Sequence, residues 1–304
     1  MSFYAFVLIL ASVILHVGWN LLSKSKSPTI EFCLIVNGVA AVLTVPAIYL
    51  AHIDWASLSF LFWITFLISA IANLIYCSSL FAAYSHSDIS LVYPVARALP
   101  VLLTVLFTMI FDIGQPPSTL AFAGMTIVFC GCMLMPINRW RDVNWETYAS
   151  SALGLILLAA LGTTCYTICD SKAIGLFFEA ARLGNSGPGR IIIVSTAYLA
   201  MLECAITAGL LPVLFLPKTR RNFRKLCLHS WEPYASGLFT AAAYVLVLMA
   251  MPHVTNVSFV QAFRQMGLPL SVAAGTLILK EKCPPTRIFG VIIIVIGLIM
   301  AAYK

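Results

Sequence analysis

Long apolar runs, separated by short segments rich in polar residues, proline or glycine, extend along the whole chain. A helix needs about 20 mostly apolar residues to cross the hydrocarbon core of a bilayer. The runs predict ten membrane-spanning helices, at residues 3–23, 29–51, 57–84, 89–111, 117–137, 149–173, 190–215, 232–252, 255–279 and 285–303. The chain is therefore expected to be an all-α integral membrane protein.

The two halves of the chain share a sequence pattern. The segment HSDISLVYPVARALP at 86–100 aligns without a gap with HVTNVSFVQAFRQMG at 253–267, so that Arg97 lies over Arg264. Near the end of each half, a Pro-Pro pair precedes two glycines that are seven residues apart. These glycines are Gly124, Gly131, Gly290 and Gly297. In the first helix of each half, the match is weaker and puts Trp19 over Tyr166.

Five helices per half is an odd number, so the second copy must enter the membrane in the opposite sense. Such inverted repeats place the substrate site near the bilayer midplane, between the halves. We therefore predict a first five-helix repeat at 1–137, a linker at 138–148 and a second five-helix repeat at 149–304.

Arg97 and Arg264 interrupt these apolar runs. An arginine at the centre of a membrane helix costs about 2.5–3.5 kcal/mol on insertion scales. Each lies about three residues before the centre of its helix, hence roughly 4–5 Å from the midplane at a rise of about 1.5 Å per residue. The two helices run oppositely, so the guanidinium groups are expected to flank one central cavity. Their forks of donors suit a substrate carboxylate or phosphate. The alternative is that they pair with carboxylates or helix-end carbonyls.

Other polar residues inside the predicted spans complete the candidate site. Asp170 and Glu203 are the acidic ones, and as intramembrane charges they are expected to couple transport or to balance the arginines. Glu203 is a candidate proton carrier, with a packing role as the alternative. Asp170 is expected to lie near an interface or at the site.

The substrate-binding candidates, besides the two arginines, lie on three predicted helices. His16 and Asn20 are four residues apart and share a helix face, with Trp19 adjacent. Tyr93 lies one turn from the first arginine and Gln261 about one turn from the second, so each is expected to share its arginine's face.

Composition excludes several classes of protein. The 304 residues are 61% hydrophobic and 10% charged, with a mean hydropathy of +0.98, which no soluble domain of this length tolerates. The net charge of +7 does not indicate nucleic acid, because most basic residues lie in short loops between spans. The sequence has no phosphate-binding loop and no metalloprotease or serine-hydrolase motif, so we expect no enzyme, cofactor or metal site.

The loop charges predict an orientation. One side of the predicted membrane holds twelve basic residues, Lys24, Lys26, Arg139, Arg141, Lys218, Arg220, Arg221, Arg224, Lys225, Lys280, Lys282 and Arg287. The other side holds four, Lys172, Arg182, Arg190 and Lys304. Because cytoplasmic loops carry the excess of Lys and Arg, both termini are expected outside.

Four strings give the chain a resemblance to a known family: HVGWNLLSK in the first helix, YPVARALP in the fourth, YTICD in the sixth and FRQMGLPLSVAAGTLILKEK in the ninth. They resemble the EamA-type branch of the drug/metabolite transporter superfamily, and the likeness covers nearly the whole chain. It implies export or exchange of small metabolites, often amino acids, with the fourth and ninth helices lining the centre. Related sugar-phosphate carriers use cationic residues on those helices to bind phosphate.

The chain departs from that family in two respects. Asp112 follows the fourth helix where the family often has Gly-Glu, an element that only Glu281 keeps. Relatives are also generally drawn with both termini in the cytoplasm, opposite to the charge count.

The expected function is secondary active transport of a small anionic or zwitterionic metabolite by alternating access, with a proton or a counter-substrate as coupling partner. We expect a multi-pass protein of the bacterial inner (cytoplasmic) membrane with no nucleic-acid partner. One alternative is a multidrug exporter of amphipathic or cationic compounds, for which an acidic, aromatic cavity is expected. Another is a membrane-embedded lipid-modifying enzyme, for which catalytic residues would cluster near one interface.

Overall fold

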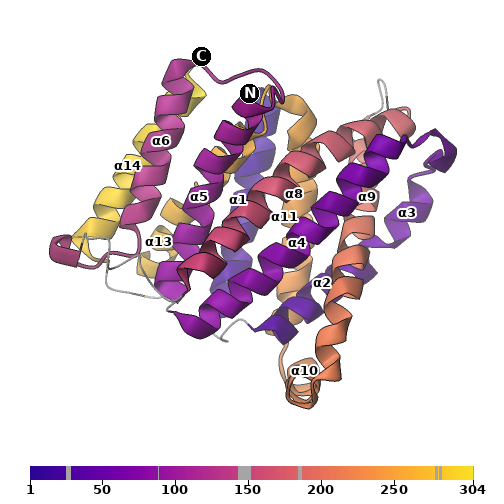
Figure 1. The fold of residues 1–304 in the computed structure, drawn as a ribbon, viewed down its shortest axis with the longest axis horizontal. Coiled ribbons are helices and arrows are strands. Elements are labelled where there is room, and N and C mark those ends of the chain that lie inside the picture. The colour runs from indigo at the N-terminus through magenta and orange to yellow at the C-terminus, as the bar shows by residue number, and fades with distance from the viewer. Residues whose placement is uncertain are drawn as a thin grey trace.

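The chain folds into a bundle of helices in a computed structural model (Figure 1), which describes residues 1–24, 29–87, 89–142, 152–183, 187–277, 280 and 283–303. The helices of the first half are α1 (Phe3–Lys24), α2 (Ile30–Thr44), α3 (Pro46–Leu50), α4 (Phe60–His86), α5 (Ile89–Ile110) and α6 (Thr119–Leu134). Those of the second half are α8 (Leu153–Ala180), α9 (Pro188–Leu210), α10 (Pro217–His229), α11 (Glu232–Ala250), α12 (Ser258–Arg264), α13 (Gly267–Leu277) and α14 (Pro285–Ala302). The described residues contain no strand.

Seven stretches of helix are long and apolar enough to cross a membrane: Ile30–Leu50, Phe60–Tyr84, Leu91–Ile110, Leu153–Ala180, Pro188–Phe215, Glu232–His253 and Pro285–Ala302. Phe3–Gly18 and Thr119–Leu134 are shorter apolar helices. Large apolar side chains such as Phe60 and Leu67 point outward, 79% and 59% exposed, as lipid contact requires. The all-α, multi-pass membrane architecture is thus confirmed, whereas the count of ten spans stays a prediction.

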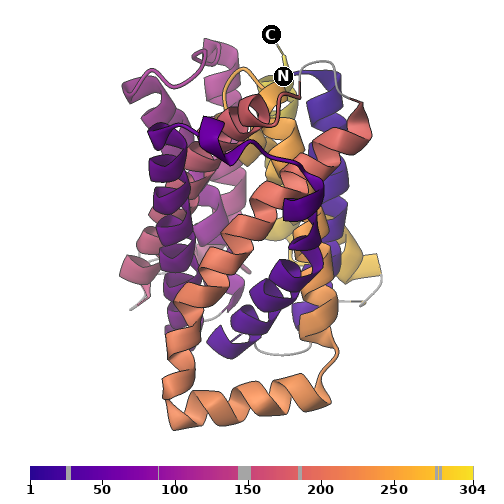
Figure 2. The same ribbon diagram turned by 90° about the vertical axis from the view of Figure 1, so that its right-hand side faces the viewer.

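Helices far apart in sequence pack side by side. α4 lies along α8, α1 along α11, and α6 along α14, while α2 contacts both α9 and α11. Both chain ends lie at one end of the bundle, and the basic helix α10 lies at the opposite end (Figures 1 and 2). The basic run KTRRNFRK at 218–225 lies within α10 and is helical. It is therefore separated from both chain ends by the height of the bundle.

The glycines spaced seven residues apart form the contact between α6 and α14. A Cβ built on Gly124 would lie 2.6 Å from the carbonyl oxygen of Gly297, and one on Gly131 would lie 2.9 Å from that of Gly290. Position 124 meets 297 and 131 meets 290, which is the register of two antiparallel helices. Small residues permit this approach of two backbones, as at other membrane helix interfaces.

Two segments differ from the sequence-based predictions. The helix predicted at 255–279 is two helices, because α12 ends at Arg264 and α13 begins at Gly267. Pro269 lies in the first turn of α13, where its missing N–H removes no helical hydrogen bond. The helix predicted at 149–173 is longer at its carboxyl end, because α8 continues to Ala180.

Candidate functional site

Two adjoining cavities lie inside the bundle. The larger has a volume of about 140 Å³ and the smaller about 40 Å³. They share five lining residues, His16, Tyr76, Leu80, Tyr166 and Arg264. The linings combine α1, α2, α4 and α5 of the first half with α8, α9, α11 and α12 of the second. The cavities are therefore built jointly by the two halves of the chain.

Arg97 projects from α5 into the smaller cavity. Its Nη1 donates to the hydroxyl oxygen of Tyr93 at 3.0 Å, and its guanidinium carbon lies 5.4 Å from the centre of that ring. Its Nη2 donates to the backbone carbonyl oxygen of Arg264 at 3.2 Å. That carbonyl is free for a side chain because α12 ends there. The Nε of Arg97 is buried and has no hydrogen-bond partner in the described part of the chain.

Arg264 is the last residue of α12 and lines both cavities. Its guanidinium carbon lies 5.9 Å from the centre of the Tyr244 ring. Neither arginine forms an ion pair with an acidic side chain among the described residues, which include Asp170 and Glu203. The carboxylate-pairing alternative therefore does not describe this conformation, and helix-end pairing describes only one of the N–H groups of Arg97.

Asp170 is fully buried in α8 and lines neither cavity. Its Oδ1 accepts hydrogen bonds from the Ser69 hydroxyl at 2.5 Å and the Tyr198 hydroxyl at 2.7 Å. Its Oδ2 accepts one from the Tyr244 hydroxyl at 2.5 Å. Asp170 is therefore satisfied by hydroxyl groups of the protein rather than by water, and it lies outside the linings of both cavities. The carboxyl group instead fixes Tyr244, whose ring forms a cavity wall beside Arg264.

Glu203 lies on α9, is 5% exposed and lines the larger cavity. Its Oε2 is buried and has no hydrogen-bond partner among the residues that the structure describes. Of the two acidic candidates, it is the one that faces the cavity.

The glutamines lie where α12 meets α5 and α8. Gln261 donates from Nε2 to the Thr167 hydroxyl at 2.6 Å, and Gln265 donates from Nε2 to the Arg97 carbonyl oxygen at 3.1 Å. Gln261 and Gln265 are four residues apart, and both line the smaller cavity.

The candidates on α1 divide into two groups. His16 lines both cavities. Trp19 and Asn20 lie in α1, and their side chains fall outside the part of the chain that the structure describes.

Sequence reasoning did not single out several cavity residues. Tyr76, Tyr166 and Tyr244 line the larger cavity, as do Asn37 and Asn73. All five are polar residues inside apolar runs, where membrane helices rarely place them without a protein or water partner. That signal was present in the sequence.

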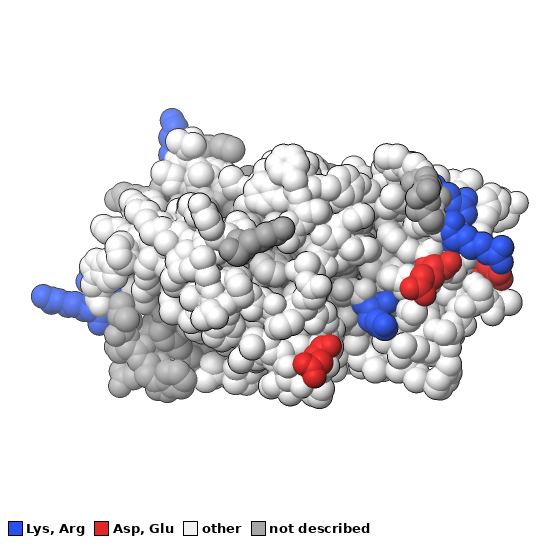
Figure 3. Space-filling model, turned by 90° about the horizontal axis from the view of Figure 1, so that it is seen from above, with Lys and Arg blue, Asp and Glu red and all other residues white. Residues whose placement is uncertain are grey.

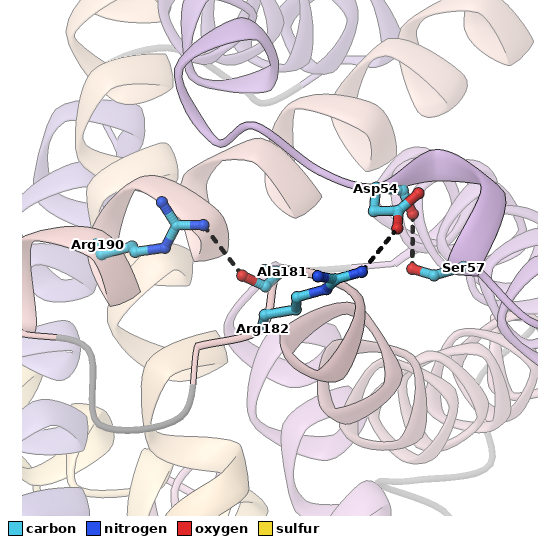
Figure 4. A network of polar contacts seen from close by, with 5 residues as sticks. All are labelled: Asp54, Ser57, Ala181, Arg182 and Arg190. Atoms are coloured by element: carbon cyan, nitrogen blue, oxygen red, sulfur yellow. Dashed lines mark hydrogen bonds and ion pairs between the residues drawn. The ribbon is translucent and has the colours of Figure 1, made fainter.

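A separate polar network lies at the end of the bundle that carries the termini (Figure 4). The Arg182 guanidinium lies 3.4 Å from a carboxylate oxygen of Asp54, and Arg190 donates to the Ala181 carbonyl oxygen at 3.0 Å. The Arg182 side chain is 82% exposed, so this pair contributes little stability. Seen from this end, the described surface carries few charged side chains (Figure 3).

Comparisons with known proteins identify the fold and no family. No family model and no curated protein matches the chain. A solved structure described as "Crystal structure of protein" matches with a TM-score of 0.67 and 14% sequence identity. The match covers 98% of this chain and 97% of the other. At that identity the likeness shows a shared fold and nothing about function. No group of three or more metal-ligating side chains occurs within the described ranges.

Proposed function

We propose that this chain is a secondary active transporter that exports or exchanges a small anionic or zwitterionic metabolite, such as an amino acid or an organic or phospho acid. The observation that carries the proposal is the pair Arg97 and Arg264. They come from corresponding positions of the two halves, line one cavity, and have no acidic partner among the described residues. A substrate anion supplies the missing counter-charge.

The geometry of Arg97 favours a binding role. Its Nη2 donates to the last carbonyl oxygen of α12, and its Nη1 donates to the Tyr93 hydroxyl. These two hydrogen bonds hold the guanidinium group at the cavity wall. Five N–H donors leave others for a ligand. Hydrogen bonds between a guanidinium and a carboxylate or phosphate are about twice as strong as neutral ones.

The size of the cavities limits the substrate. An apolar protein cavity of about 150 Å³ holds one benzene molecule. The larger cavity, at about 140 Å³, therefore has room for a ligand of comparable size, and the smaller one for a terminal acidic group.

The termini support ten spans. Both ends of the chain lie at one end of the bundle (Figure 1), which requires an even number of crossings. Seven long helices make an odd number among the described residues, which favours crossings by shorter helices as well. Counting α1, α6 and the α12–α13 pair as crossings gives ten.

The packing supports inverted repeats with limits at 1–137 and 149–304. In the proposed repeat, each helix of the first half has a counterpart in the second: α1 and α8, α2 and α9, α4 and α11, α5 and α12–α13, α6 and α14. Exchanging every helix for its counterpart turns the contact between α4 and α8 into a contact between α11 and α1. The same exchange turns the contact between α2 and α11 into one between α9 and α4. All four contacts occur in the structure. The contacts of α2 with α9 and of α6 with α14 join counterparts, so the exchange leaves them unchanged. This internal symmetry fits alternating access.

Family membership and location belong to the same proposal. The quoted strings and the cavity between the fourth and ninth helices favour an EamA-type transporter of the bacterial inner membrane. A proton or a counter-substrate is the coupling partner. Two cavity arginines against one cavity acid favour an anionic or zwitterionic substrate over a cationic drug.

Counterflow into proteoliposomes tests the proposal. Labelled anionic, zwitterionic and cationic metabolites are offered to the parent protein, Arg97→Gln, Arg264→Gln and the control Arg190→Gln, which lies outside the cavities. We expect the parent and the control to move an anion or amino acid, and either cavity variant, purified in folded form, to lose at least tenfold in rate. Transport that survives both cavity changes would show that the arginines are structural, and His16, Trp19 and Asn20 would become the leading site.

A further inference from the structure

Helix α10 carries a concentrated positive charge. Its 13 residues include five basic side chains and no acidic one. The five, all of them exposed, are Lys218, Arg220, Arg221, Arg224 and Lys225. None forms an ion pair with an acidic side chain among the described residues. Like charges three or four residues apart destabilise a helix, so α10 holds an unbalanced charge that an external anion would neutralise.

One side of α10 packs onto the bundle. Thr219 is buried, and Phe223 is partly buried against the hydrophobic core. The Nδ2 of Asn222 donates to the Oε1 of Glu31 in α2 at 3.3 Å. These contacts hold the helix against the start of α2 and fix its rotation about its own axis.

The basic side chains lie on the other side of the helix. Arg221, Arg224 and Lys225 are three and four residues apart and therefore share a face. Leu228 lies about one turn further along the same face and is exposed. At about 100° per residue, this face is turned roughly opposite to the side that carries Thr219. The basic face thus points away from the bundle.

The position of α10 is that of a membrane interface. The helix lies across the end of the bundle rather than along it (Figure 2). It follows directly on one apolar stretch, Pro188–Phe215, and another, Glu232–His253, begins soon after it ends. The flanking residues Leu216 and Trp231 are exposed. Tryptophan and basic side chains are the usual anchors of membrane proteins at the level of the lipid headgroups.

We propose that the basic face of α10 binds the headgroups of anionic phospholipids at this end of the bundle. Guanidinium groups form charge-assisted hydrogen bonds with phosphate oxygens, and basic segments beside a membrane are attracted to an anionic leaflet. The exposed apolar side chains of Leu216, Leu228 and Trp231 favour a lipid over a soluble polyanion, because a lipid also supplies acyl chains for apolar contact. This inference does not depend on the proposed transport function.

Quenching of Trp231 fluorescence by brominated lipids tests the inference. Trp231 lies two residues after α10 and is 64% exposed. The protein is reconstituted in phosphatidylcholine bilayers that contain either brominated phosphatidylglycerol or brominated phosphatidylcholine. Each protein is measured with and without Trp231→Phe, and the difference isolates this tryptophan from the others. One basic residue near the surface strengthens anionic lipid binding about fivefold, so we expect the parent to prefer phosphatidylglycerol by at least that factor.

Substitutions on the basic face locate the site. The triple variant Arg221→Gln/Arg224→Gln/Lys225→Gln should reduce the preference to below about twofold. Arg221→Lys/Arg224→Lys keeps the charge and should keep the preference. A salt titration of the parent needs no variant and therefore does not depend on folding of the triple variant. Between 0.1 M and 1 M salt the screening length falls from about 10 Å to about 3 Å, and the preference should fall with it.

A matched control separates α10 from net charge. Arg139→Gln/Arg141→Gln/Arg182→Gln removes the same number of charges from exposed positions outside α10 and should leave the preference unchanged.

Three results would overturn the inference. Equal quenching of the parent by the two brominated lipids, at low and at high salt, means that this end of the bundle does not select anionic lipid. A preference that survives the triple substitution, or that the control loses equally, means that the basic face of α10 does not bind the headgroup. Competition by millimolar sn-glycerol 1-phosphate, which has the headgroup phosphate but no acyl chains, would make a soluble anion the ligand.

Discussion

The hydroxyl of Tyr244 offers a direct test of the network around Asp170. Tyr244→Phe removes the hydrogen bond to the Oδ2 of Asp170 and keeps the ring that lies 5.9 Å from the Arg264 guanidinium. The bonds from Ser69 and Tyr198 go to the other oxygen and remain. The change therefore isolates one contact.

The expected magnitude follows from that geometry. A hydrogen bond to a charged group contributes about 1.5–3 kcal/mol, and its loss leaves a buried oxygen unsatisfied. We expect Tyr244→Phe to lower the free energy of unfolding by about 2 kcal/mol. Asp170→Asn keeps Oδ1 as an acceptor but replaces the charge-assisted bond from the Tyr244 hydroxyl with, at most, a neutral amide-to-hydroxyl bond, so a loss is expected here as well. Because both changes disrupt the same bond, the double variant should lose less than the sum by about 1–2 kcal/mol.

Reversible unfolding of the purified protein in mixed detergent micelles measures these differences. Tyr303→Phe is the matched control, because Tyr303 is 70% exposed. It should change stability by less than about 0.5 kcal/mol. Additive effects of Tyr244→Phe and Asp170→Asn, or a loss below about 0.5 kcal/mol for Tyr244→Phe alone, would refute the argument.

Three further predictions concern the bundle outside the cavities. Gly297→Ala places a methyl group 2.7 Å from the Gly124 carbonyl oxygen and should destabilise by about 1–3 kcal/mol in the same assay, whereas Gly154→Ala, with open space around it, should not. Asn256→Ala removes bonds to the Thr108 hydroxyl, to the Ser258 N–H and to two carbonyl oxygens of the α5–α6 connection, so a loss of about 3 kcal/mol is expected on unfolding. A carboxyl-terminal tag should react with an impermeant reagent in intact cells, because the basic helix α10 lies at the opposite end; labelling only after permeabilisation would show the reverse orientation.

Local features of the sequence determined the elements and some contacts. Apolar runs of bilayer length fixed most helices, because unpaired backbone groups are excluded from lipid. The four-residue spacing of Tyr93 and Arg97 predicted a shared face, and the two side chains are in contact. The seven-residue glycine spacing marked a helix face, and that face forms the α6–α14 contact.

The tertiary structure decided the rest, because helical periodicity relates residues only within a few turns. Ser69 and Tyr244 are 101 and 74 positions from Asp170, so no local pattern pairs them. α12 ends at Arg264, and the carbonyl oxygen left free there accepts from Arg97 of α5, a contact between residues 167 positions apart. The sequence by itself determined which charges enter the membrane, but packing of the two halves decided that Asp170 is satisfied by hydroxyls while Glu203 faces the cavity.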